Sequence, residues 1–295
     1  MSGPWRTTLP DRALHGCHAL RQSARMSVTA MSLAAASPNA SWSVSPGPLV
    51  VLAGLTFIYV RRWRQCDASV GRILLFLSGI AVAAIALFSP VDSLGEDLFL
   101  MHMVQHILLL DIAPILCILG LTRVLLRPIA RPLLRLERNA GPLAHPAFAI
   151  LLYVGSMWVW HIPALYDAAL EHPALHILEH TFFSFGGALY WWHFLSPIRS
   201  RHLGGMGPVM YMIATKLLVG ALGIALAFAP DALYAFYEDH PRYWGLSAET
   251  DQAIGGLIMA TEQSIIMGIA LVTLFVRALA ESEREEQRRE RFGEA

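Results

Sequence analysis

The chain has 295 residues, of which 55% are hydrophobic, and a mean hydropathy of +0.49. This composition is too apolar for an ordinary soluble domain and indicates an all-α, polytopic membrane protein. Basic and acidic residues are equal at 22 each, so the net charge gives no reason to expect nucleic acid as a partner. Cys17, Cys66 and Cys117 form no CxxC pair and outline no disulfide framework.

Residues 1–45 are rich in Ser, Ala, Pro and Arg and contain no strong apolar stretch. The segment Val28–Ala36 is too weakly apolar to be a signal peptide. We therefore interpret residues 1–45 as a disordered or non-native leader, with Met26 as the alternative start. Residues 46–278 are predicted to form the transmembrane domain, and residues 279–295 a charged cytoplasmic tail.

Seven apolar segments follow the leader, bounded by Pro, Gly and charged residues. Most of them are long enough for a helix to cross about 30 Å of hydrocarbon at about 1.5 Å per residue. The sequence therefore predicts a bundle of seven transmembrane helices over residues 47–61, 72–90, 98–120, 145–162, 173–195, 207–229 and 253–277.

Arginine placement predicts how this bundle is oriented, because cytoplasmic loops of membrane proteins are enriched in Lys and Arg. Arginines crowd the loops after the first, third and fifth segments and the tail after the seventh. The alternate loops are acidic, and Arg242 is the only arginine in them. The N-terminus is therefore predicted to lie outside and the C-terminus in the cytoplasm.

Six histidines fall in the outer half of this predicted bundle. A spacing of four residues places two of them on one face of segment 98–120 and three on one face of segment 173–195. An ionisable side chain inside an apolar helix is costly, so it usually has a partner and a function. The sequence thus predicts one metal site, open to the outside, with the candidate ligands His102, His106, His161, His172, His176 and His180.

Other polar residues at similar depth are assigned supporting roles. Met259 is a candidate ligand of the same metal, while Glu179 and Glu262 are expected to orient histidines or move protons. Asp111 is left out of the site, because a straight helix places it nearly opposite His102. We instead expect Asp111 to pair with Lys216 of the sixth segment. The residues predicted to support the ligands are Glu179, Glu262, Gln105 and Gln263.

This set of donors is compatible with several metals. Histidine with carboxylate or thioether neighbours suits zinc, copper, iron or haem. The outer half contains no cysteine, and histidine together with methionine favours copper. The stretch His176-Ile-Leu-Glu179-His180 also matches the H-x-x-E-H pattern of zinc proteases, although a single copy on a membrane helix is a weak match.

Motifs distributed over residues 48–277 carry a family resemblance. They are His102-Met-Val-Gln-His106-Ile-Leu-Leu, the run from Ala113-Pro114 to Gly120, Trp160-His-Ile-Pro163-Ala-Leu-Tyr-Asp167, Leu178-Glu-His-Thr-Phe-Phe183 and Asp251-Gln-Ala-Ile-Gly-Gly256-Leu-Ile-Met259. In these motifs the chain resembles the CtaG family of caa-type cytochrome c oxidase assembly factors. The resemblance implies a multi-pass protein of the bacterial plasma membrane, which acts with subunits of a haem-copper oxidase.

The residues and the resemblance together favour a non-enzymatic assembly factor that binds or delivers copper at the outer face of the membrane. Three alternatives stay open. A membrane metallo-hydrolase would hold zinc through the histidines and use Glu179 as a general base. A haem-binding or haem-handover protein would use two histidines as axial ligands. A structural scaffold would use the histidines only for helix contacts.

Overall fold

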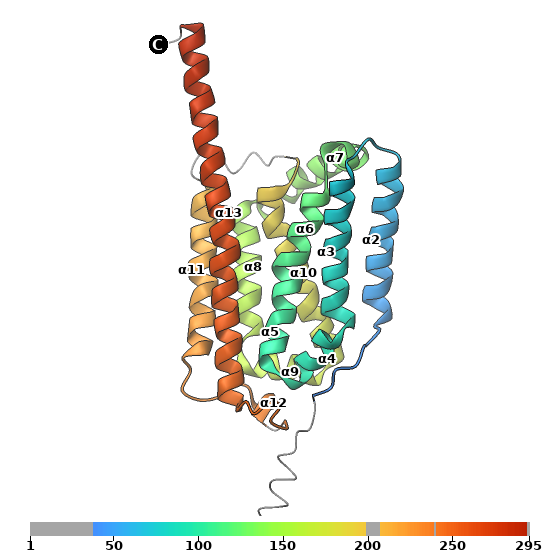
Figure 1. Ribbon diagram of the computed structural model, residues 1–295, viewed down its shortest axis with the longest axis vertical. Helices are drawn as coiled ribbons and strands as arrows, with labels where there is room; N and C mark the ends of the chain where they lie inside the picture. Colours follow the sequence, from blue (N-terminus) through green and yellow to red (C-terminus); the bar gives the residue numbers. More distant parts are fainter. Residues whose placement is uncertain (1–37, 199–206, 239, 294–295) are drawn as a thin grey trace, which may run out of the picture.

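The computed structural model describes residues 38–198, 207–238 and 240–293, and its regular elements are all helices. Most of the predicted leader, residues 1–37, and the loop arginines Arg199 and Arg201 lie outside the described residues. The long helices run side by side in one bundle, and the last of them extends well beyond it (Figure 1).

The long helices correspond to the seven apolar segments. They are α2 (Pro46–Arg64), α3 (Val70–Phe88), α5 (Phe99–Ile107) with the π-helix η1 (Leu108–Ile112) and α6 (Ala113–Gly120), α8 (Pro146–Trp160), α10 (Pro173–Leu195), α11 (Gly207–Ala227) and α13 (Ala248–Phe292). Between them lie α4 (Pro90–Asp97), the amphipathic α7 (Arg123–Ala140), the 3₁₀ turn η2 (Gly141–Ala144), α9 (Pro163–Glu171) and α12 (Ala235–Glu238). Helix α13 is longer than predicted, because it continues as a helix through residues 279–292.

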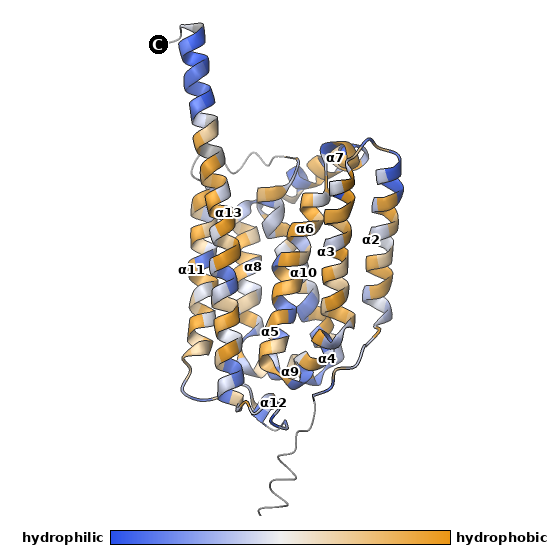
Figure 2. Cartoon of the chain, viewed as in Figure 1, coloured by the Kyte–Doolittle hydropathy of each residue, from blue (hydrophilic) through white to orange (hydrophobic). Residues whose placement is uncertain are grey.

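Length and composition support four or five membrane spans among the described residues. Four stretches qualify alone, namely α3, the α5–η1–α6 rod, α11 and the Ala248–Val276 part of α13. A fifth is obtained if residues 123–160, which bend by 62° before α8, count as one span. Helices α2 and α10 do not qualify, since arginines end the first and histidines interrupt the second. Figure 2 shows mainly hydrophobic helices and a hydrophilic extension of α13.

Helices α11 and α13 pack closely because small residues face each other. A Cβ atom added at Gly223 would lie 2.9 Å from the carbonyl oxygen of Gly256, and one added at Gly256 would lie 2.6 Å from the Ala227 nitrogen. Small residues at such contacts let two membrane helices approach without a side chain between their backbones. This contact sets the position of α13 beside the rod formed by α5, η1 and α6.

The rod is fixed at the N-terminal end of α5 by a carboxylate from α13. The Asp251 side chain accepts hydrogen bonds from the backbone nitrogens of Phe99, at 2.7 Å, and Leu100, at 3.0 Å. These nitrogens belong to the first turn of α5, where N–H groups have no partner within the helix. Asp251 therefore caps α5 from a distant part of the sequence and neutralises the positive end of its dipole.

We expect Asp251→Ala to lower the free energy of unfolding by about 1–2 kcal/mol, the usual cost of losing a capping side chain. Thermal unfolding of the detergent-purified protein measures this loss. Glu249→Ala is the matched control, because Glu249 lies in the same first turn of α13 but is exposed. Equal melting temperatures for the two variants would show that the cap contributes nothing.

Candidate metal centre

Four side chains from α5 and α10 come together inside the bundle. His102, His176, Glu179 and His180 each offer a ligand atom, and these atoms all lie within 4.8 Å of one another. The Glu179 carboxylate lies 3.6 Å from His102 Nε2 and 3.5 Å from Nε2 of His106. The spacing of four on both helices therefore produces the facing rows that the sequence predicts. We call these five residues the His/Glu cluster.

The cluster contains several buried polar atoms without a hydrogen-bond partner among the described residues. These atoms are Nε2 of His102, His106, His176 and His180, and both carboxylate oxygens of Glu179. Leaving buried polar groups unpaired is costly, and folded proteins rarely do so. A cation bound between these atoms would satisfy them, and neutral imidazoles with a carboxylate form a common ligand set for copper or zinc. The residues present therefore fit a metal ion.

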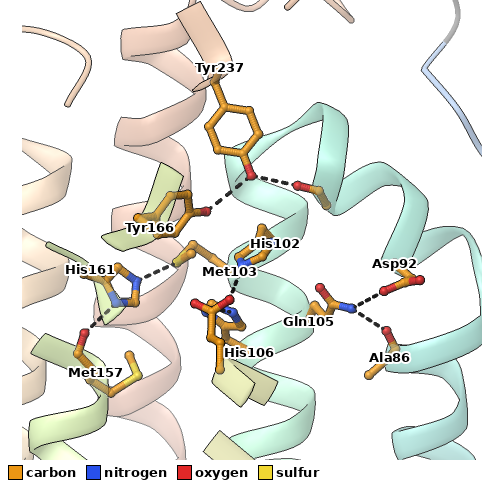
Figure 3. A network of polar contacts seen from close by, with 12 residues as sticks. Ala86, Asp92, His102, Met103, Gln105, His106, Met157, His161, Tyr166 and Tyr237 are labelled. Atoms are coloured by element: carbon orange, nitrogen blue, oxygen red, sulfur yellow. Dashed lines mark hydrogen bonds and ion pairs between the residues drawn. The ribbon is translucent and has the colours of Figure 1, made fainter. Parts of the chain in front are cut away.

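Three tyrosines close the cluster on the side of α4, α9 and α12. The Tyr166 ring lies 5.3 Å from the His102 ring, and its hydroxyl lies 3.3 Å from that of Tyr237. Figure 3 shows Tyr166 and Tyr237 with their hydroxyls facing each other. Tyr237 also donates a hydrogen bond to the Gly95 carbonyl oxygen at 2.7 Å, and the Tyr234 ring packs on that of Tyr166. Burial raises the pKa of the Tyr166 and Tyr237 hydroxyls well above the usual value, so both stay protonated donors.

This closure corrects the prediction of a site open to the outside. His102 is 1% exposed and Glu179 is fully buried. His176 is the cluster member that stays partly exposed, so it lies at the nearest approach to the surface. Tyr166 lies in α9, Tyr237 lies in α12 and Tyr234 directly precedes α12. The apolar pattern does not predict α9 or α12, because both are short and lie between the long helices.

Two predicted ligands lie apart from the His/Glu cluster. His172 is exposed and precedes the first turn of α10, with an extended backbone (φ −123°, ψ 107°) that ends the helical row. The His161 ring lies 6.0 Å from that of His106, and its Nε2 faces the sulfur of Met103 at 3.3 Å. The structure therefore brings four of the six predicted histidines into the cluster.

The glutamines do not orient the histidines as predicted. Gln105 donates to the Ala86 carbonyl oxygen at 2.8 Å and to Asp92 at 2.7 Å, on the side of α3 and α4 (Figure 3). Gln263 donates to the Tyr153 hydroxyl and to Glu262, each at 3.0 Å. Both amides therefore stabilise contacts between helices rather than the imidazoles.

A small cavity separates the His/Glu cluster from a buried carboxylate group. His106 and Met259 line this cavity together with Asp111 and Glu262. Its volume of about 10 Å³ holds roughly one water molecule. Met259 thus lies near the cluster without belonging to it, and Glu262 faces Asp111 rather than a histidine of the cluster.

Asp111 has other partners than the predicted one. Its carboxylate accepts hydrogen bonds from the Tyr153 hydroxyl at 2.8 Å and from Trp191 Nε1 at 2.6 Å. Among the described residues it makes no ion pair with Lys216, so that prediction was wrong. Asp111 lies in the π-helix η1, whose turns are wider than those of an α-helix, and its carboxylate faces Tyr153 of α8 and Trp191 of α10 instead of α11. No residue pattern in the sequence signals this turn.

Tyr153→Phe removes one donor from the fully buried Asp111 carboxylate, and we expect it to cost about 1–3 kcal/mol of stability. Thermal unfolding measures the loss. Tyr190→Phe is a matched control on a buried tyrosine, whose hydroxyl contacts the Met267 sulfur at 3.7 Å instead of a carboxylate. A smaller loss for Tyr153→Phe than for Tyr190→Phe would contradict the role given to Asp111.

Comparison with known families places this chain in one of them. Residues 54–281 match the family model described as the cytochrome c oxidase caa3 assembly factor, Caa3_CtaG. The chain belongs to this family. The match runs from the middle of α2 into α13 and includes every residue of the His/Glu cluster.

Longer proteins are also similar to this chain. An uncharacterized protein of Mycobacterium leprae is 25% identical over 279 residues, which make up 84% of this chain and 41% of that protein. Uncharacterized proteins of Mycobacterium bovis and Mycobacterium tuberculosis are each 30% identical over 227 residues, 70% of this chain and 34% of theirs. The chain thus spans less than half the length of these relatives. No solved structure matches it.

Proposed function

We propose that this protein holds a copper ion in the His/Glu cluster and supplies it during assembly of a haem-copper oxidase. The single observation that carries the proposal is the set of buried, unpaired donor atoms on α5 and α10. Membership of the caa3 assembly factor family supports the oxidase as the partner. Copper is the metal that such an oxidase needs, and it binds more strongly than zinc to a given nitrogen and oxygen site.

A site that hands over its metal must release it. The cluster suits this task because Glu179 lies near both His102 and His106, so the ion can exchange one donor for another. The partly exposed His176 then offers the point at which a partner's ligand reaches the ion. Transfer by ligand exchange leaves the oxidation state of the ion unchanged.

We further propose that all seven long helices cross the bacterial plasma membrane, with the N-terminus outside. Helix α10 has 23 residues, or about 35 Å at 1.5 Å per residue, and its ionisable residues face the interior of the bundle. The arginine-rich α7 lies at the same end of the bundle as the C-terminus, while α4, α9 and α12 lie at the other (Figure 1). This arrangement supports a cytoplasmic C-terminus and a metal site near the outer face.

Two other functions can be separated from this one by experiment. A zinc hydrolase needs an open position on the metal and room for a substrate, whereas the described cavity beside the cluster holds about one water. A haem needs space for its porphyrin between two histidines, and Glu179 with the neighbouring imidazoles fills the region between His102 and His180.

The test is the metal content of the purified protein after loading with copper or with zinc. We expect about one copper ion per His/Glu cluster, a colourless protein without a haem absorption band, and restored oxidase activity when the gene is returned to cells that lack it. Stoichiometric zinc with hydrolysis of a lipid would establish an enzyme instead. Absence of copper binding, together with normal oxidase assembly by a His102→Ala variant, would overturn the proposal.

A further inference from the structure

A second group of soft donor atoms lies beside the His/Glu cluster, on the far side of His106. It consists of His161, which follows the last turn of α8, and of three methionines from three helices: Met103, Met157 and Met259. All four side chains are buried, with exposures of 5% or less. The three methionines also line the small cavity next to His106. We call this group the thioether cluster.

Hydrogen bonding fixes which ring nitrogen of His161 carries a proton. Nδ1 lies 2.6 Å from the Met157 carbonyl oxygen, which can only accept, so Nδ1 is the donor (Figure 3). A neutral imidazole has one ring hydrogen, so Nε2 presents a lone pair. That lone pair faces the Met103 sulfur at 3.3 Å, and a thioether has no hydrogen to donate. Two buried electron-pair donors therefore face each other with no proton between them.

The spacing of these two atoms suits a shared metal ion. With metal–nitrogen and metal–sulfur bonds of about 2.0 and 2.3 Å, two ligands at an angle near 100–110° lie about 3.3–3.5 Å apart. Met157 and Met259 line the same cavity as Met103, so their thioethers are available to complete the shell. On the edge of this region, Gln263 Oε1 and Glu262 Oε1 are also buried and have no hydrogen-bond partner within the part of the chain that the structure describes.

We infer that the thioether cluster is a second ion site, selective for Cu(I). Thioether sulfur is a soft ligand that favours Cu(I), whereas zinc takes imidazole and carboxylate more readily. The inference rests on the proposed copper function, because it adds a second, neighbouring binding site for the same ion. His106 connects the two sites, since its Nε2 lies 3.5 Å from Glu179 and its ring lies 6.0 Å from that of His161. An ion can thus pass between them by ligand exchange while it stays Cu(I).

The test compares how much Cu(I) and Zn(II) the full chain binds in detergent under reducing conditions. A background with Cys17→Ser, Cys66→Ser and Cys117→Ser removes competing thiols. We expect this background to bind two Cu(I) but one Zn(II). The variant Met103→Leu/Met157→Leu/Met259→Leu keeps side-chain volume, so it should bind one Cu(I) and still one Zn(II). X-ray absorption should show a sulfur neighbour near 2.3 Å only before the methionines are replaced.

Met267→Leu is the matched control, because Met267 is equally buried on α13 but contacts Tyr190 instead. It should keep two Cu(I). Retained Zn(II) binding shows that the triple variant is folded. If the triple variant binds as much Cu(I) as the background, the thioether site is refuted while the His/Glu cluster stands. If the background binds a single Cu(I) that is lost with the methionines, the proposed function fails and the second site survives.

Discussion

Replacing His176 and His180 together with alanine is expected to abolish metal binding at the His/Glu cluster and to stop oxidase maturation. The two side chains supply two of the four ligand atoms that lie within 4.8 Å of one another. Loss of a group that merely orients a ligand weakens metal affinity about 10–100-fold, so loss of two ligands should exceed about 1,000-fold. Copper content of the purified variant and oxidase activity in complemented cells measure the two effects.

His172→Ala is the matched control for this double variant. It removes the histidine four residues before His176, which is exposed and lies just before the first turn of α10. We expect normal copper content and normal oxidase activity. If His172→Ala reduces the copper content as strongly as the double variant does, then His172 is a ligand. The sequence pattern would then be right to include it, and the assignment of ligands from the structure would fail.

This contrast shows what helical periodicity can predict about such a site. A spacing of four residues is enough to place His102 with His106 and His176 with His180, because both pairs lie within regular helix. It includes His172 wrongly in that row, because periodicity does not say where the helix begins. Pro173 is a helix-start signal, and it marks His172 as the residue outside.

Contacts between helices are less accessible to the sequence than faces of a single helix. A helical wheel gives the direction of Gln105 or Gln263 relative to its neighbours on the same helix. It does not say which other helix lies in that direction, so the amides could not be assigned to Asp92 and Tyr153. Asp111 adds a second difficulty, because the π-helix changes the direction itself.

The position of the π-helix has a further consequence, at its contact with α10. Gly187 lies seven residues after His180, and a Cβ atom there would overlap the carbonyl group of Leu110 in η1. The obstacle is backbone, so no side-chain rotation relieves it. Any side chain at position 187 must therefore push α10 away from the rod that carries His102, and the distances within the His/Glu cluster depend on this approach.

Gly187→Ala is accordingly expected to destabilise the protein by more than about 3 kcal/mol, above the usual range for overpacking, and to weaken metal binding at the same time. Gly186→Ala is the matched control. A Cβ atom at Gly186 would lie 3.7 Å from Leu152 Cγ, an ordinary contact, and alanine favours the helix by about 1 kcal/mol over glycine. Thermal unfolding and copper content of the two variants decide the matter. If Gly187→Ala has the same melting temperature as the wild type and binds copper normally, then contact with η1 does not hold α10 in register.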